Sequence, residues 1–286
     1  DVCSSDLLEF SSSPEIYDNS LQAWFKDMTN YDLSLMHFLF GAGAEMANEL
    51  GIKTEAAHWN KLKSQLPDFD LDNEGSLTFA KGFPYNASHR HFSHALAIHP
   101  LGIIDWSDGE KAQRIIRATL KKMNDYGPDY WTGYTYSWFA NMQARAFNGE
   151  EAAKALRTFA ECFCLKNTFH ANGDQSASGK SKFTYRPFTL EGNFAFAAGI
   201  HEMLLQSHTG VIRVFPAVPE SWKNVSFNNL RAMGGFLVSA ALKDGKVVRL
   251  EIYAEKGGRL AVFSPFEHKV VEYDTQPGSR IDLAVE

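Results

Sequence analysis

The spacing of apolar residues changes once along this chain of 286 residues, and that change constrains the fold more than any other feature. From about residue 19 to residue 206, apolar residues recur at three- and four-residue intervals, which is typical of amphipathic helices. After His208 they alternate with polar residues or form short runs, which indicates β-strands. The sequence therefore predicts a mainly helical region at residues 8–207, followed by a β-sandwich-like domain at residues 208–286.

Helices are predicted where this spacing is joined to start and stop signals. Residues 31–50 carry apolar side chains three or four positions apart, and Gly51 follows as a C-cap would. These apolar residues are Leu35, Phe38, Leu39, Ala42, Met46 and Leu50. Further helices are expected at residues 54–66, 108–126, 134–147, 150–163 and 189–207. Gly149 separates two of them into an antiparallel pair, and a series of such pairs indicates a toroid.

Strands are expected at residues 211–215, 236–240, 247–253 and 259–263. Two dipeptides lie between these segments, Asp244-Gly245 and Gly257-Gly258. Both are predicted to form hairpin turns, because glycine readily adopts the positive φ angles that such turns need.

The composition narrows the function classes. A net charge of -6 and the absence of a basic stripe argue against nucleic acid as a partner. No run of 18 apolar residues occurs, so no membrane partner is expected. Cys3, Cys162 and Cys164 are too few for a disulfide framework or a four-ligand zinc site. The 22 Phe, 10 Tyr and 6 Trp residues suit either stacking on sugars or filling a large core.

The opening residues 1–7 show no periodicity, and we expect a truncated N-terminus. Any export signal of the full protein would then lie outside this chain.

The densest polar cluster is the segment His89-Arg90-His91-Phe92-Ser93-His94. Its histidine spacing could suit zinc, but no carboxylate completes a zinc motif and Arg90 would repel a cation, so no metal is expected. The cluster offers hydrogen-bond donors for sugar hydroxyls. Alternatively, its histidines cap a helix that starts near Phe92.

Two carboxylates and one loop are further candidates. Glu191 opens a predicted helix, where the helix dipole alone would stabilise it, although Gly192 beside it indicates close approach of another group. Glu15 follows Pro14 in an irregular segment, so it too has a structural alternative. Residues 173–181 look like a phosphate loop but have one residue too many between their glycines, and are interpreted as a flexible loop at the rim of the toroid.

Several segments together resemble glycoside hydrolase family 95, which includes α-L-fucosidases and α-L-galactosidases. They are Ser13-Pro14-Glu15, His89–His94, Glu191-Gly192-Asn193-Phe194, residues 202–207, residues 215–219 and residues 230–236. The resemblance covers nearly the whole chain after residue 8. It implies part of an (α/α)6 toroid, then a β-sandwich-like domain, and an inverting hydrolysis that needs no cofactor.

The resemblance also implies roles. Glu15 matches the general acid, whose pKa an enclosed site should raise. Arg90 and His91 match residues that hold sugar hydroxyls, and His89, His94 and Asn193 are further candidates for substrate binding. Glu191 stands where the family usually has an Asp that polarises the water-positioning amide. The family also needs two asparagines on a preceding loop, for which this chain shows no counterpart, so we expect the chain alone to be inactive.

These roles imply an oligosaccharide or polysaccharide substrate that ends in α-L-fucose or α-L-galactose. Family members commonly act outside the cytoplasm, so a periplasmic or extracellular location is expected for the full-length protein. One alternative is a carbohydrate-binding homologue with impaired catalysis, which the Asp-to-Glu change at Glu191 favours. A weaker one is a different (α/α)6 enzyme, such as a lyase or a phosphorylase.

Overall fold

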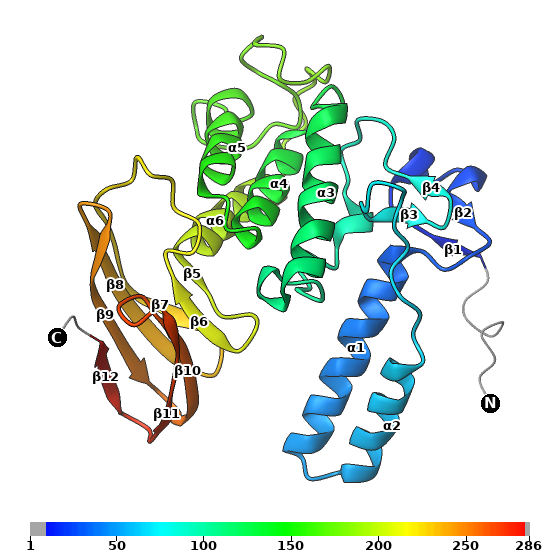
Figure 1. Cartoon of the computed structure of the whole chain (residues 1–286). Coiled ribbons are helices and arrows are strands. Elements are labelled where there is room, and N and C mark those ends of the chain that lie inside the picture. The colour runs from blue at the N-terminus through cyan, green and yellow to red at the C-terminus, as the bar shows by residue number, and fades with distance from the viewer. Residues whose placement is uncertain (1–9, 284–286) are drawn as a thin grey trace. The chain divides into compact units, whose positions relative to one another are not determined.

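The computed structural model describes residues 10–283, and Figure 1 shows helices and four short strands followed by a C-terminal set of longer β-strands. Cys3 and the two ends of the predicted domains lie outside the described residues. The chain forms two compact units. The N-terminal unit holds the described residues up to Thr135 together with Ala177–Thr184, and the C-terminal unit holds Tyr136–Ser176 and the residues from Tyr185 onward.

The helices lie close to their predicted positions, which confirms the expectation of a helical region followed by a β-domain. They are α1 (Asn30–Glu49), α2 (Lys53–Ser64), α3 (Glu110–Tyr126), α4 (Gly133–Arg145), α5 (Gly149–Cys162) and α6 (Glu191–Leu204). Helix α1 begins after Thr29, whose hydroxyl accepts a hydrogen bond from the backbone N–H of Asp32 at 3.2 Å. It ends before Gly51, whose φ of 73° is the left-handed conformation that favours glycine.

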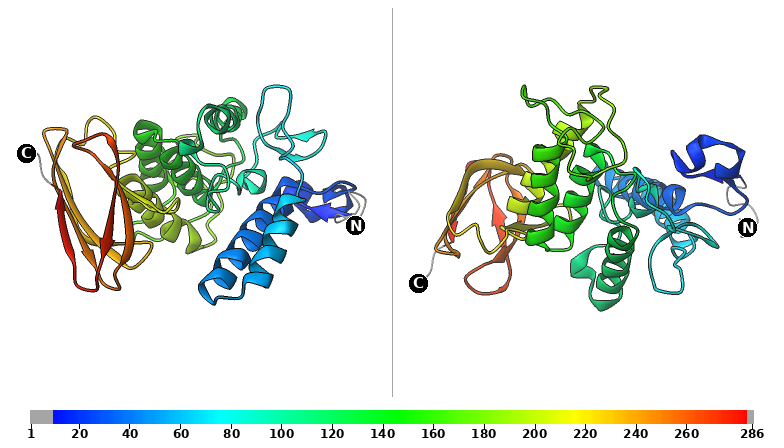
Figure 2. Two further views of the ribbon diagram at one scale, coloured as in Figure 1. Left: turned by 60° about the horizontal axis from the view of Figure 1, so that its bottom comes forward. Right: turned by 90° about the horizontal axis from the view of Figure 1, so that it is seen from above.

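Helices α1 and α2 lie side by side as a hairpin in all the views (Figures 1 and 2). Their packing is close, since a Cβ on Gly43 would lie 3.0 Å from the Trp59 ring. The apolar stripe that predicted α1 is nevertheless exposed; Met46, for example, is 64% accessible. Small residues such as Ala44 and Ala47 are buried instead. The spacing of apolar residues therefore predicted the position of α1 correctly but not which of its faces is buried.

The expectation of a helix starting near Phe92 was wrong. The chain forms only a three-residue 3-10 helix, Ser93–Ala95. Its backbone closes turns three residues apart, from Ala95 N–H to the Phe92 carbonyl at 2.8 Å and from Ile98 N–H to the Ala95 carbonyl at 3.0 Å. Pro100, which has no N–H to donate, follows shortly and disfavours a longer helix.

Short strands frame the first part of the N-terminal unit. They are β1 (Ser11–Ser12), β2 (Trp24–Phe25), β3 (Thr78–Ala80) and β4 (Phe83–Pro84). Asn30, at the start of α1, donates from its side-chain amide to the carbonyls of Asp70 and Thr78, each at 2.8 Å. This buried amide fixes β3 against the start of α1, just before the segment that carries the histidine cluster.

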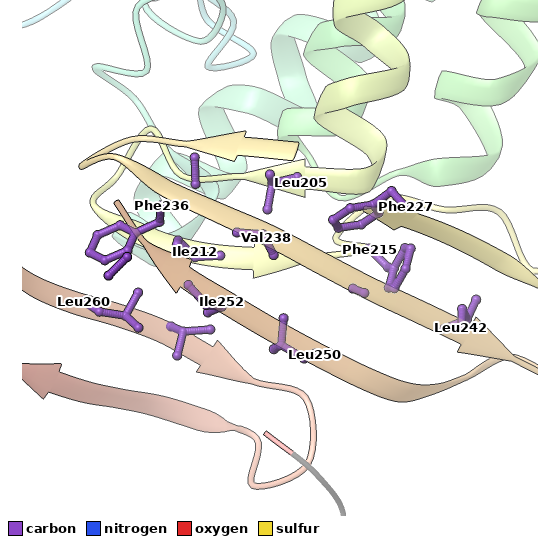
Figure 3. Packing of buried hydrophobic residues seen from close by; sticks show 14 residues of the cluster. Leu205, Ile212, Phe215, Phe227, Phe236, Val238, Leu242, Leu250, Ile252 and Leu260 are labelled. Atoms are coloured by element: carbon purple, nitrogen blue, oxygen red, sulfur yellow. The ribbon is translucent and has the colours of Figure 1, made fainter. Parts of the chain in front are cut away.

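The C-terminal unit contains two four-stranded sheets, in the orders β11-β10-β6-β5 and β12-β9-β8-β7. Their strands are β5 (Leu205–Gln206), β6 (Val211–Val214), β7 (Val225–Ala232), β8 (Phe236–Lys243), β9 (Lys246–Ala254), β10 (Gly258–Ser264), β11 (Lys269–Thr275) and β12 (Arg280–Leu283). Alternate residues of both sheets, such as Leu250, Ile252 and Leu260, form one buried cluster (Figure 3). The sheets therefore pack face to face as a sandwich.

The two predicted turns differ in outcome. Asp244-Gly245 joins β8 to β9, which pair antiparallel, so this hairpin is confirmed. Gly257-Gly258 instead links β9 of one sheet to β10 of the other, so the hairpin predicted there was wrong. A Cβ on Gly257 would lie 2.8 Å from the Thr275 carbonyl oxygen, which explains why a glycine suits this crossing.

None of the helices described between residues 10 and 283 combines the length and the apolar character needed to cross a membrane.

Candidate functional site

A carboxylate and a guanidinium lie at the centre of the candidate site in the N-terminal unit. Arg90 donates from Nη2 to Oε2 of Glu15 at 2.7 Å, across 75 positions of sequence. His91 places Nε2 at 4.0 Å from the same Glu15 oxygen, and Asp18 places Oδ1 at 3.5 Å from the Arg90 Nη2. The side chains of Glu15 and Arg90 are 40% and 26% exposed, so this charged group is reachable from solvent.

The backbone of Glu15 is held as firmly as its side chain. The Glu15 carbonyl lies 3.1 Å from Nε2 of His89, and its N–H donates to the Asn19 side chain at 2.9 Å. Nδ1 of His89 lies 3.0 Å from the His91 backbone nitrogen and 3.1 Å from the His91 carbonyl oxygen. Burial, together with the neighbouring Arg90 charge, lowers the pKa of His89, which favours the neutral imidazole. His89 therefore holds the Glu15 backbone in place.

The segment around Glu15 has an unusual backbone. Glu15, Tyr17 and Asp18 adopt φ angles of 65°, 48° and 51°, in the left-handed region that non-glycine residues rarely enter. Ser13, fully buried, anchors the segment through its Oγ, which lies 2.6 Å from the Ser93 Oγ. Such strain is typical of segments whose side chains the rest of the fold holds in a functional orientation.

A cavity of about 420 Å³ adjoins this group, within the size range of small-molecule sites. Its walls combine polar and aromatic side chains with the aliphatic Ile16 and Ala87, all from the N-terminal unit. The polar residues are Asp18, Asn86, Ser88, His89 and Arg90, and the aromatic residues are Tyr17, Phe79, Tyr130 and Phe183. Polar groups beside aromatic rings can bind a molecule that has hydroxyls at its edge and C–H groups on its faces.

His94 lies apart from the other two histidines of its segment. It is fully buried, with its ring 5.1 Å from that of Tyr85 and 4.7 Å from that of Phe79. Burial lowers the pKa of His94 to about 3, and neither ring nitrogen has a hydrogen-bond partner among the described residues. The structure thus places His94 in the core, a position that does not favour direct contact with a sugar.

The second carboxylate belongs to the C-terminal unit. Glu191 is exposed and opens α6, and Gly192 beside it is buried. A Cβ on Gly192 would lie 2.4 Å from Nδ1 of the buried His170, so His170 is the closely approaching group that this glycine indicates. Asn193 accepts from the His170 backbone N–H at 3.0 Å and donates to the Thr168 carbonyl at 2.9 Å. Its amide therefore braces the loop before α6.

The structure brings Glu15, His89, Arg90 and His91 together, and their roles stay predictions. The sequence motifs did not include three of their neighbours. Tyr130 and Phe183 line the cavity although they come from loops between α3 and α4 and between α5 and α6. Asp18 is a third residue that was missed. The aromatic loop residues and an acid three positions after Glu15 were visible signals, but only the folded chain shows that they meet.

Comparison with known sequences decides the family. The sequence model of the glycosyl hydrolase family 95 catalytic domain matches residues 6–204, and that of the family 95 C-terminal domain matches residues 206–282. This chain belongs to glycoside hydrolase family 95. The resemblance noted from its motifs is thereby confirmed.

Two curated relatives of this family 95 chain are named as fucosidases. Alpha-L-fucosidase 2 of Arabidopsis thaliana is 31% identical over 232 residues, which cover 79% of this chain and 27% of the relative. Probable alpha-fucosidase A of Aspergillus niger is 23% identical over 247 residues, which cover 82% of this chain and 28% of the relative. The family 95 chain thus spans about a quarter of the length of these relatives.

Proposed function

We propose that this protein acts as a glycoside hydrolase that removes terminal α-L-fucose or α-L-galactose from an oligosaccharide or polysaccharide, with inversion at the anomeric carbon. Family membership and the fucosidase names of its relatives support this proposal. The observation that carries it is the Glu15 carboxylate, held 2.7 Å from Arg90, which itself lines a cavity with polar and aromatic walls.

Glu15 is proposed as the general acid that protonates the departing glycosidic oxygen. We propose that Arg90 exchanges its contact with Glu15 for a sugar hydroxyl when substrate binds, which leaves the carboxyl group free to reach the glycosidic oxygen. His91, about 31% exposed in its side chain, is proposed to bind another hydroxyl. His89 keeps the Glu15 backbone in place during this exchange, through its contact with the Glu15 carbonyl.

Glu191 is proposed to polarise the side-chain amide that positions the attacking water. It stands where the family usually has an Asp, and one additional methylene extends the carboxylate by roughly 1.5 Å. A displacement of this size is enough to alter a near-attack geometry. We propose that the α6 backbone, fixed by Gly192 against His170, compensates for the longer side chain.

The test replaces Glu15 with Gln in a catalytically complete protein, which we define as this chain supplied with the asparagine-bearing segment of the family. E15Q should lower the hydrolysis rate of a fucosyl oligosaccharide by about 10²–10⁴-fold. An activated aryl fucoside, whose leaving group needs little protonation, should lose much less. Equal losses on both substrates would contradict the role of Glu15 as acid, and NMR of the first-formed anomer tests inversion.

The same assay distinguishes the remaining proposals. We propose that residues 1–286 alone do not turn over substrate, because they lack the asparagine pair; turnover by this chain would refute that. The change to Glu191 favours a second candidate, a carbohydrate-binding homologue with impaired catalysis. Binding of L-fucose without turnover by the complete protein would decide for this second candidate.

A further inference from the structure

Two aromatic rings on the cavity wall form a pair that the proposed chemistry at Glu15 does not use. Tyr130 comes from the connection between α3 and α4, and Phe183 from the excursion Ala177–Thr184 between α5 and α6. Their ring centroids lie 5.7 Å apart at an interplanar angle of 68°, an edge-to-face arrangement. Tyr130 is 47% exposed, so much of its surface is open to a ligand.

The excursion is tied to the segment that carries Tyr130. The backbone N–H of Lys182 donates to the Asp129 carbonyl at 2.7 Å, and Lys182 Nζ lies 2.7 Å from the Asp129 Oδ2. The same ammonium lies 5.3 Å from the centre of the Tyr130 ring. The hydrogen bond and the ion pair between Lys182 and Asp129 thus hold the segments of Phe183 and Tyr130 together, although 53 positions of sequence separate the two rings.

Tyr130 is also tied to the polar wall of the cavity. Its backbone N–H donates to Ser88 Oγ at 3.0 Å, and Ser88 Oγ donates to the Gly127 carbonyl at 2.7 Å. Ser88 directly precedes His89, whose ring contacts the Glu15 carbonyl, so a short series of contacts connects the ring pair to Glu15. The rings are therefore placed relative to the proposed acid by hydrogen bonds within one unit.

We propose that Tyr130 and Phe183 bind the leaving-group sugar, that is, the sugar to which the terminal fucose or galactose is attached. This inference rests on the proposed function. A general acid protonates the oxygen that departs, so the leaving group lies on the side of the acid. The cavity lies next to the acid, since its wall includes Ile16, Tyr17 and Asp18, which follow Glu15 directly.

The chemistry of the wall fits a pyranose better than a plain apolar group. The C–H faces of a pyranose pack on aromatic rings, while its hydroxyls need polar partners. Asn86, Ser88 and Asp18 supply such partners on the same cavity. The ring pair therefore gives preference for substrates whose leaving group is a sugar over those with a small leaving group.

The test compares two substrates in the catalytically complete protein: L-fucose α-1,2-linked to lactose, and α-L-fucosyl fluoride, which has no leaving-group sugar. F183A and Y130A should each lower kcat/KM for the trisaccharide by about tenfold and leave the fluoride reaction within about twofold. F183Y keeps an aromatic ring and should retain most of the wild-type activity on the trisaccharide. The matched control is F188A, because Phe188 is an exposed ring of the same connection that stacks on Phe169 at 4.8 Å and is not part of the cavity wall.

The outcomes separate this inference from the proposed function. A loss in F183A that is equal on both substrates, or absent on the trisaccharide, overturns the role of the ring pair. If the wild type cleaves neither substrate, the proposed hydrolysis fails, and saturation-transfer NMR with lactose on residues 1–286 then decides the inference alone. Transfer to lactose that F183A abolishes and F188A preserves supports it, and no transfer in the wild type overturns it.

Discussion

The site around Glu15 and the β-sandwich are stabilised by different kinds of contact. The sandwich core consists of alternate apolar residues on neighbouring strands, and β8 to β9, for example, is a hairpin whose partners are close in sequence. The site has irregular backbone, left-handed residues and an ion pair between positions 75 apart. Side chains in the sandwich are held by burial, and those in the site by specific polar partners.

This difference has a consequence for mutations. Removing an apolar group from the sandwich should lower stability and leave the chemistry of the folded protein unchanged. Removing a charged partner from the half-exposed site should reduce function with little effect on stability, because exposed ion pairs contribute little free energy of folding.

The largest effect is expected from R90A. Loss of the guanidinium removes the group that holds Glu15 and is proposed to bind a sugar hydroxyl, so kcat/KM on a fucosyl oligosaccharide should fall by about 10²–10³-fold. Thermal unfolding should show a change of at most about 1 kcal/mol. The matched control is R249A, which removes an exposed arginine paired with Glu251 in the sandwich and should leave activity unchanged. A loss below tenfold in R90A, with folding intact, would contradict the proposed role.

The reverse pattern is expected from I252A. Ile252 is 1% exposed in the sandwich core, and truncation there should cost about 2–5 kcal/mol of unfolding free energy. Urea unfolding followed by circular dichroism measures this cost. Activity per folded molecule should stay within about twofold of the wild type. A large drop in activity at full folding would show that the separation between the two regions does not hold.

The smallest effect at neutral pH, but a distinct one in acid, is expected from H94L. The folded protein keeps His94 neutral with a pKa of about 3, whereas the unfolded chain takes up a proton near the ordinary value of 6.5. Because the unfolded chain takes up this proton first, the free energy of unfolding is highest above pH 6.5 and falls as the pH drops from 6.5 toward 3. Leu does not titrate, so the free energy of unfolding of H94L should fall less steeply as the pH drops. Identical pH profiles of the melting temperature would count against this account.

The sequence located most elements because their signals are local. The helix spacing, the cap at Gly51 and the alternation in β8 and β9 each depend on residues a few positions apart. The family motifs also placed Glu15, Arg90 and His91 in one hypothesis. The helix expected near Phe92 and the hairpin expected at Gly257-Gly258 failed because local signals cannot show which turn or which sheet the rest of the fold will favour.

By itself, the sequence determined that a helical region precedes a β-domain, and its motifs determined the family. The tertiary structure decided which histidines meet Glu15, that His94 belongs to the core, and that Phe183 joins Tyr130 on the cavity wall. The physical reason is range. Periodicity is a property of neighbours along the chain, whereas a site is a set of contacts between distant segments that exist only once the loops are closed.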